Sequence, residues 1–161
     1  MIQRIFIASL FALVFVGCNS SIQQPQSEID TRVSAMMPTT DSVQVLETSP
    51  QGAPITVCYY HQDTQLFVQY HLDSSLRSIG KAINGKRQGE WVTFYPTGVI
   101  QSKCNYINGL EEGAYEVNRE NGQPYYRGQY LHGTRIGQWD IYDAQGTIVQ
   151  QTTYPLPNNG N

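Results

Sequence analysis

The sequence predicts an all-β protein, an elongated antiparallel β-meander built from 24-residue hairpin repeats and preceded by a disordered tether. Three observations lead to this fold class. Glycine and aromatic residues recur every 24 positions between residues 85 and 154. The chain contains 11 Tyr and 14 Gly but only 14% charged residues, a balance typical of short strands and tight turns. The 3.6-residue apolar period of a helix is absent from residue 55 onward.

Each repeat is expected to contain a strand, a turn, a second strand and a second turn. Three complete copies span residues 85–108, 109–132 and 133–155, and a degenerate copy spans about 61–84. Glycine tolerates positive φ, so its recurrence marks the turns and connections. The turn glycines are Gly85, Gly89, Gly98, Gly109, Gly113, Gly122, Gly133, Gly137 and Gly146. The whole repeat domain covers 52–155 and leaves 156–161 as a C-terminal tail.

Two aromatic columns keep the same 24-residue period. They are Phe67, Trp91, Tyr115 and Trp139 on first strands, and Tyr106, Tyr130 and Tyr154 on second strands. Because side chains alternate across a strand, each column occupies one face of the sheet. Small residues such as Gly80 and Gly128 fall beside the first column, which predicts rings lying over neighbouring backbone. We expect these columns to form most of the core, and a stacking platform for carbohydrate or peptide is the alternative.

The first 17 residues are typical of a signal peptide. Arg4 precedes an uncharged apolar run over 5–17, which is shorter than the ~20 residues of a membrane-spanning helix. The run ends in Phe15-Val16-Gly17-Cys18, which resembles the lipobox of bacterial lipoproteins. That resemblance implies cleavage before Cys18, acylation of Cys18 and attachment to a membrane through the lipid. Asn19 in the following position implies the outer membrane, with the chain facing the periplasm.

Residues 18–51 are predicted to form a flexible, lipid-anchored tether. The segment is rich in Ser, Gln, Thr and Pro and lacks a periodic apolar pattern. Such a composition buries too little apolar area to offset the entropy of ordering the chain. Within it, residues 41–46 alternate in polarity, so an early strand there is the alternative.

No catalytic residue, metal site or cofactor is predicted. The histidines, His61, His71 and His132, lack metal-ligand spacing. Glu111 and Glu112 lie in a connection between strands and are interpreted as solvated turn residues, with a glycosidase acid pair as the alternative. A net charge of −3 argues against a nucleic-acid partner, which requires a basic surface, and none is expected.

A disulfide between Cys58 and Cys104 is not expected. The two residues are nearly two repeats apart, which places them ~15–20 Å apart in a meander with strands every ~4.8 Å. The Cα atoms of a disulfide rarely lie more than ~7 Å apart. A buried free thiol is the interpretation of Cys104.

The segment GKRQGEWVTFYPTGVI and its two later copies resemble the MORN repeat variant of bacterial proteins. The middle copy departs from the pattern, with Tyr115 in place of Trp and Asn118 where Phe94 and Tyr142 stand in the other copies. Lipoproteins with such repeats resemble the YwqK-like group, whose family name implies antitoxin activity. The expected function is a non-enzymatic envelope lipoprotein that presents its repeat sheet to another envelope protein or polymer. An immunity or antitoxin-like protein that neutralises a periplasmic effector is the alternative.

Overall fold

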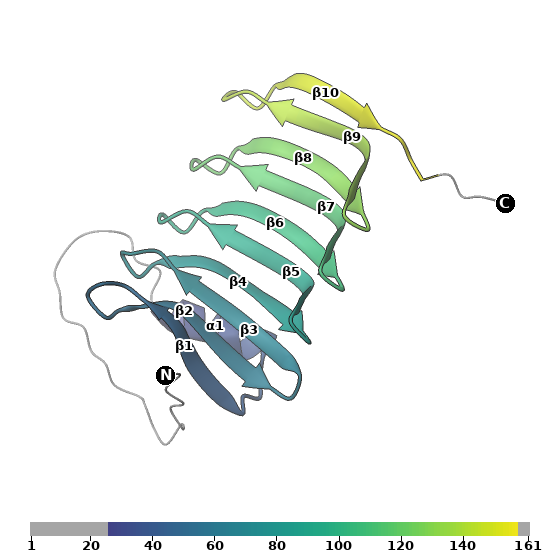
Figure 1. Cartoon of the computed structure of the whole chain (residues 1–161). Coiled ribbons are helices and arrows are strands. Elements are labelled where there is room, and N and C mark those ends of the chain that lie inside the picture. Colours follow the sequence, from purple (N-terminus) through teal and green to yellow (C-terminus); the bar gives the residue numbers. More distant parts are fainter. Residues whose placement is uncertain (1–25, 158–161) are drawn as a thin grey trace.

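The computed structural model describes residues 26–157, which form one helix and a ten-stranded sheet (Figure 1). The elements are α1 (Gln26–Met36), β1 (Ser42–Thr48), β2 (Pro54–His61), β3 (Thr64–Tyr70), β4 (Leu76–Ile83), β5 (Lys86–Phe94), β6 (Ile100–Ile107), β7 (Leu110–Asn118), β8 (Pro124–Leu131), β9 (Thr134–Tyr142) and β10 (Ile148–Tyr154). The strands follow one another in the sheet in chain order, and the pairing is antiparallel throughout. The predicted antiparallel meander is therefore confirmed.

One turn geometry closes every hairpin at the same end of the repeat. In the β5–β6 turn, the amide of Gly98 donates to the carbonyl of Tyr95 (2.8 Å), and the amide of Tyr95 donates to the carbonyl of Val99 (2.9 Å). Gly98 has φ +81°, which glycine adopts without steric cost. The same pair of hydrogen bonds recurs in the turns that contain Gly52, Ser74, Gly122 and Gly146.

The hairpin β1–β2 is thus a further copy of the repeat that the sequence did not reveal. Its turn residue, Gly52, precedes Ser74 by 22 positions rather than 24, so a search at a fixed period passes over it. Ser74 itself has φ +68°, in the same left-handed region as the glycines of the other copies, which have φ of +81° to +84°. Turn geometry is preserved here although both the spacing and the residue type have changed.

The connections between hairpins use two glycines for two different purposes. Asn84 and Gly85 both have positive φ (+50° and +75°), as a two-residue turn between strands of right-handed twist requires. Gly89 (φ +71°) lies at a β-bulge, because the register jumps from Trp91 opposite Gly80 to Gln88 opposite Lys81. Two strands, two turns and a glycine bulge together make up the 24-residue period.

Residues 26–48 are not the flexible tether that the sequence predicted, because they form α1 and β1. Ile29, Val33 and Met37 are buried and lie four residues apart, on one stripe of the helix and its end. This stripe is short and is surrounded by Ser, Gln and Thr, so it is stable only once packed on the sheet. The alternating segment that starts at Asp41 forms the edge strand β1, which pairs with β2.

Helix α1 covers only part of one sheet face, which we call the helix face. A row of directly paired positions on this face changes in character along the sheet, from apolar side chains on the early strands to charged ones on the later strands. In strand order its members are Val57, Val68, Ile79, Val92, Lys103, Glu116, Arg127 and Asp140. Val68, Ile79 and Val92 belong to the cluster that contains α1, and opposite charges face each other across neighbouring strands of the uncovered half, which is a favourable pairing.

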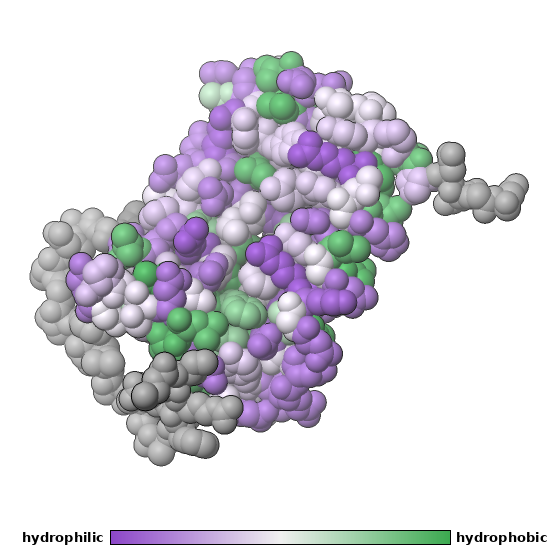
Figure 2. Space-filling view, in the orientation of Figure 1, coloured by the Kyte–Doolittle hydropathy of each residue, from purple (hydrophilic) through white to green (hydrophobic). Residues whose placement is uncertain are grey.

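The largest buried cluster lies on the helix face, so the prediction that the aromatic columns form most of the core is wrong. Leu66, Val68, Ile79 and Phe94 pack there against α1. On the other face Trp139 is buried, but the remaining members of the two columns are half-buried. The physical reason is that α1 excludes water from the helix face alone. Figure 2 shows mainly hydrophilic and intermediate residues over β5 to β10, with apolar residues in small separate patches.

Candidate functional site

The sheet face opposite α1, which we call the aromatic face, carries both aromatic columns. Its rings are Phe67, Trp91, Tyr106, Tyr115, Tyr130, Trp139 and Tyr154. In the three complete copies, the first-strand ring meets the tyrosine that follows it by 15 residues, in an edge-to-face contact. The ring centroids are 6.4 Å apart for Trp91–Tyr106, 5.5 Å for Tyr115–Tyr130 and 6.1 Å for Trp139–Tyr154. The rings form two groups in contact, one that contains Trp91 and one that contains Tyr115 and Trp139, with a gap between Trp91 and Tyr115.

The tryptophans lie directly over glycine backbone, as the sequence predicted. A Cβ atom added to Gly80 would fall far inside 3.0 Å of the Trp91 ring, and one added to Gly128 would meet Trp139 in the same way. On the preceding strand, the residue beside the smaller ring of Tyr115 is Cys104, whereas the two tryptophans have glycine there. Ring size and the opposing residue are thus matched within each repeat.

A guanidinium group lies over each tryptophan ring. The Cζ atom of Arg87 is 4.3 Å from the ring centroid of Trp91, and its Nη1 donates to the hydroxyl of Tyr106 (3.0 Å). One side of the indole faces Gly80 and the other faces the guanidinium, so this ring has no free side for stacking. The arrangement argues against the tryptophan ladder as a stacking platform for carbohydrate or peptide.

Arg135 repeats this arrangement 48 residues later. Its Cζ atom is 4.7 Å from the ring centroid of Trp139, and its Nη1 donates to the hydroxyl of Tyr154 (3.2 Å). Hydrogen bonding to the hydroxyls of Tyr154 and Tyr130 holds the pKa of Arg135 above its usual value. In the middle copy the same position is Glu111, so the aromatic face alternates in charge along its length.

A hollow of about 240 Å³ opens on the aromatic face between Trp91 and Tyr115. Its lining residues are Gln69, Arg77, Ser78, Arg87, Trp91, Thr93, Gln101, Ser102, Cys104, Tyr106 and Tyr115. Small hydroxyl residues lie side by side on its floor, where the hydroxyls of Thr93 and Ser102 are 2.6 Å apart. One repeat later, Tyr126 replaces Ser102, and its ring lies 4.9 Å from that of Trp139. The hollow exists because Ser102 leaves free the volume that a tyrosine ring fills in the next copy.

The hollow is positively charged in a chain of net charge −3. Arg77 and Arg87 line it, whereas none of the lining residues is Asp or Glu. Within residues 26–157, neither arginine forms an ion pair. Arg77 is the extra residue of a bulge, since Ser78 pairs with Gln69 and Leu76 pairs with Tyr70. The bulge is what brings Arg77 to the hollow beside Ser78.

Sequence reasoning missed both arginines as site residues, although one signal was available. Arg87 and Arg135 occupy the same position of the 24-residue repeat, four residues before a tryptophan. No sequence pattern marks Arg77 in a comparable way, because the direction of its side chain depends on the bulge in β4.

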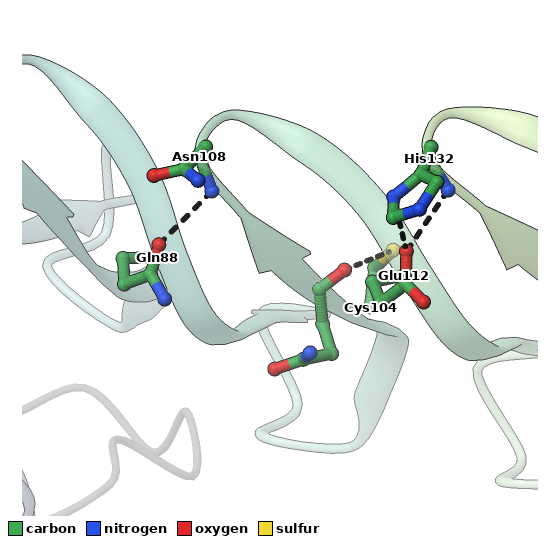
Figure 3. A network of polar contacts seen from close by, with 6 residues as sticks. Gln88, Cys104, Asn108, Glu112 and His132 are labelled. Atoms are coloured by element: carbon green, nitrogen blue, oxygen red, sulfur yellow. Dashed lines mark hydrogen bonds and ion pairs between the residues drawn. The ribbon is translucent and has the colours of Figure 1, made fainter.

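The histidines and the glutamate pair have structural roles. Nε2 of His71 lies 2.9 Å from the carbonyl oxygen of Phe94, and Nδ1 of His61 lies 3.2 Å from Asp41. The amide of His132 donates to Oε2 of Glu112 (2.9 Å), and the amide of Asn108 donates in the same way to Gln88 (Figure 3). The side chains of Gln88 and Glu112 thus connect the first strand of a repeat to the turn that leads into the following repeat.

Glu111 and Glu112 do not converge on one cleft. They are consecutive on β7, opposite Tyr106 and Asn105 respectively, and consecutive strand residues point to opposite faces. The glycosidase arrangement needs two acids on either side of one bond, which this geometry does not provide. In the part of the chain that the structure describes, no three His, Cys, Asp or Glu side chains gather as metal ligands.

Cys58 and Cys104 are both buried free thiols, as expected from their separation. They lie on β2 and β6, and burial raises the pKa of each thiol. The predicted lipidation site, Cys18, and the predicted signal peptide lie outside the described residues. Between residues 26 and 157, no helix has the length and apolar character to cross a membrane.

Comparison with known proteins identifies the repeat. A family model described as the MORN repeat variant matches residues 87–108, which cover most of the β5–β6 hairpin. This chain therefore contains a MORN repeat variant, in agreement with the resemblance seen in the sequence. None of the curated proteins compared with this chain matches it.

Two solved structures of TarM are similar at the level of the backbone. One is a mutant of the S. aureus protein in complex with fondaparinux, alpha-GlcNAc-glycerol and UDP, with a TM-score of 0.39 and 12% identity. The second has a TM-score of 0.38 and 12% identity. Each match covers 73% of this chain and 24% of the TarM chain, so this chain spans about a quarter of the length of those proteins.

Proposed function

We propose that this chain is a non-enzymatic, lipid-anchored protein of the bacterial envelope whose aromatic face binds another envelope protein or polymer. One observation carries the proposal. Within residues 26–157, no helix or strand lies over the aromatic face, yet that face holds the exposed side chains of Arg87 and Arg135 against aromatic rings through ring contacts and a hydrogen bond each. Side chains fixed in this way lose little entropy on binding, which favours recognition.

Two further observations support the proposal. The MORN repeat variant at 87–108 is consistent with a binding role. The lipobox-like sequence ending in Cys18 supports an acylated N-terminus, with the protein outside the cytoplasm and, given Asn19, on the outer membrane. Several acyl chains together make release from a bilayer negligible, so such a protein acts beside its membrane.

Site-specific photocrosslinking in cells tests the binding face. A photoreactive amino acid is placed at Gln101, which lines the hollow, and in a second variant at Gln151, which is exposed on the helix face opposite Asp140. We expect a reproducible adduct from position 101 that is lost when Arg87 is also replaced by Gln, and none from position 151. Equal adducts from both positions, or none from position 101 at saturating irradiation, would contradict the proposal.

The anchor is tested separately. Mass spectrometry of the mature protein is expected to find an acylated Cys18 at the N-terminus. A Cys18→Ala variant is expected to leave the membrane fraction. A mature chain that begins elsewhere would overturn the lipoprotein assignment without affecting the binding face.

The immunity or antitoxin-like alternative differs in the partner that it requires. It predicts that the adduct at position 101 contains a toxin encoded beside this protein. It also predicts that deletion is harmful only when that toxin is present. An adduct with a constitutive envelope component, and a harmless deletion in both backgrounds, would exclude it.

A further inference from the structure

We propose that the hollow between Trp91 and Tyr115 is a binding site for an acidic glycan, whose sugar carboxylate is held by Arg77 and Arg87. This inference rests on the proposed function and names the class of ligand that the aromatic face takes. It depends on the charge, the hydrogen-bonding groups, the position and the size of the hollow.

Charge is the first step. The two guanidinium groups are the ionised groups of the lining, and among the described residues neither has an acidic partner. A guanidinium binds a carboxylate through two parallel hydrogen bonds, which gives both affinity and orientation. Glu111 lies opposite Tyr106 but is not among the residues that line the hollow. An anion is therefore the complementary ligand.

Arg87 is already held in position before any ligand arrives. Its guanidinium lies over Trp91 and donates from Nη1 to Tyr106, with 4.3 Å and 3.0 Å separations respectively. This contact uses one of the five guanidinium N–H donors, and among residues 26–157 no other hydrogen bond of the guanidinium competes with a ligand. Because the side chain is fixed, binding costs less rotamer entropy than for a free surface arginine.

The hydrogen-bonding groups of the lining favour a sugar. The floor and walls carry the hydroxyls of Ser78, Thr93 and Ser102 and the amides of Gln69 and Gln101. Amides and hydroxyls both donate and accept, as the hydroxyl groups of a sugar do. The hydroxyl of Ser78 donates to Oε1 of Gln69 (2.7 Å), and the hydroxyls of Thr93 and Ser102 bond to each other (2.6 Å). The amide N–H groups of Gln69 and Gln101 and the second lone pairs of the hydroxyls are the groups that a sugar would use and that an isolated phosphate or carboxylate would not.

The position of the hollow disfavours a peptide. Its residues come from β3 to β7, in the interior of a ten-stranded sheet whose strands pair on both sides. An extended peptide gains affinity by adding to an exposed sheet edge, and the hollow has no such edge. An acidic peptide would meet the arginines but would lack partners for its backbone.

Size sets the length of ligand that enters. About 240 Å³ is less than the ~300–1,000 Å³ typical of sites for drug-sized ligands. We therefore assign the hollow to one acidic sugar unit of a longer glycan, with neighbouring units running along the aromatic face.

The chain provides its own design for a blocked site. Ser102→Tyr copies the residue found one repeat later, where Tyr126 fits the same sheet position and packs on Trp139. The substitution should fill the hollow and keep the fold. Arg77→Gln and Arg87→Gln remove the two charges, and Arg127→Gln removes a matched positive charge from the helix face.

Titration calorimetry of the full chain in detergent micelles tests the inference, with trigalacturonate as the probe. We expect saturable binding, a loss of at least about tenfold in affinity for each of the two arginine variants, and no measurable binding for Ser102→Tyr. The Arg127→Gln variant should bind like the original chain. The methyl ester of the probe, which keeps the sugars and removes the charge, should bind at least about tenfold more weakly.

Several outcomes would overturn the inference. Equal affinity for the methyl ester would exclude carboxylate recognition, and equal affinity for pentaglutamate or inorganic phosphate would exclude recognition of a sugar. Unchanged binding in both arginine variants would place the ligand elsewhere. If trigalacturonate does not bind but the crosslinked adduct at Gln101 still forms in cells, the aromatic face remains the binding face and the acidic glycan is excluded. If trigalacturonate does not bind and no adduct forms, the proposed function is excluded as well.

Discussion

Replacing Gly80 by Ala tests how the rings of the aromatic face pack on the sheet. The added Cβ atom falls far inside 3.0 Å of three ring atoms of Trp91, namely Cγ, Cδ2 and Cε2. Carbon atoms rest about 3.5–4.0 Å apart, so the indole has to withdraw by more than about 0.5 Å. It has little room to do so, because Arg87 lies over its other side at 4.3 Å.

The expected cost follows from these contacts. Overpacking of a well-packed site costs about 1–3 kcal/mol. Withdrawal also strains the hydrogen bond from Nε1 of Trp91 to the carbonyl of Lys81 (2.8 Å), worth about 0.5–1.5 kcal/mol. With the favourable change from Gly to Ala subtracted, we expect Gly80→Ala to lower the free energy of unfolding by about 1–4 kcal/mol. The sign of this change in the free energy of unfolding is informative, because replacing Gly by Ala in a strand without a clash stabilises a protein by about 0.5–1 kcal/mol.

Urea denaturation followed by tryptophan fluorescence measures this effect. The matched rescue is the double variant Gly80→Ala/Trp91→Tyr, which imitates the pairing of Tyr115 with Cys104 in the next copy. The double variant should lose about 1–2 kcal/mol less unfolding free energy than the two single variants lose in sum, because the smaller ring tolerates the Cβ atom. A neutral or stabilising Gly80→Ala, or additive costs, would refute the idea that the indole rests on the Gly80 backbone.

Three further predictions concern the rest of the chain. Val33→Ala should lower the free energy of unfolding by about 1–3 kcal/mol in the same denaturation assay, and no change would show that α1 is not docked on the sheet. The hydrogen bond from the Gln62 amide and the contact with His61 hold the pKa of Asp41 below its ordinary value. The hydrogen bond to Asp41 should therefore be intact at every pH above the ordinary pKa of an aspartate, and it should be lost as the pH falls through the lowered pKa of Asp41. NMR would show this loss as a shift of the Gln62 amide signal. Cys58 and Cys104 should resist a thiol reagent until the protein unfolds, and a reducing agent should leave the unfolding midpoint unchanged.

The sequence alone determined the repeat architecture. Local turn chemistry specifies the positions of Gly85 and Gly98, since each needs a positive φ that few other residues adopt. Strand alternation then places the aromatic columns on one face, and the small residue at Gly80 indicates how closely a ring approaches the backbone. These features are encoded within a few residues and repeated, so a single chain displays them several times.

Only the tertiary structure decided which face holds the main core and where the candidate site lies. The stripe of Ile29 and Val33 on α1 is too sparse to specify a helix until the apolar early strands provide a surface for it. The β1–β2 hairpin became recognisable through the bonds of its Gly52 turn, since its spacing breaks the period. Arg77 reaches the hollow because a bulge changes its direction, and Arg87 is fixed by rings from two strands. Such contacts join residues distant in the chain, and local sequence preferences do not encode them.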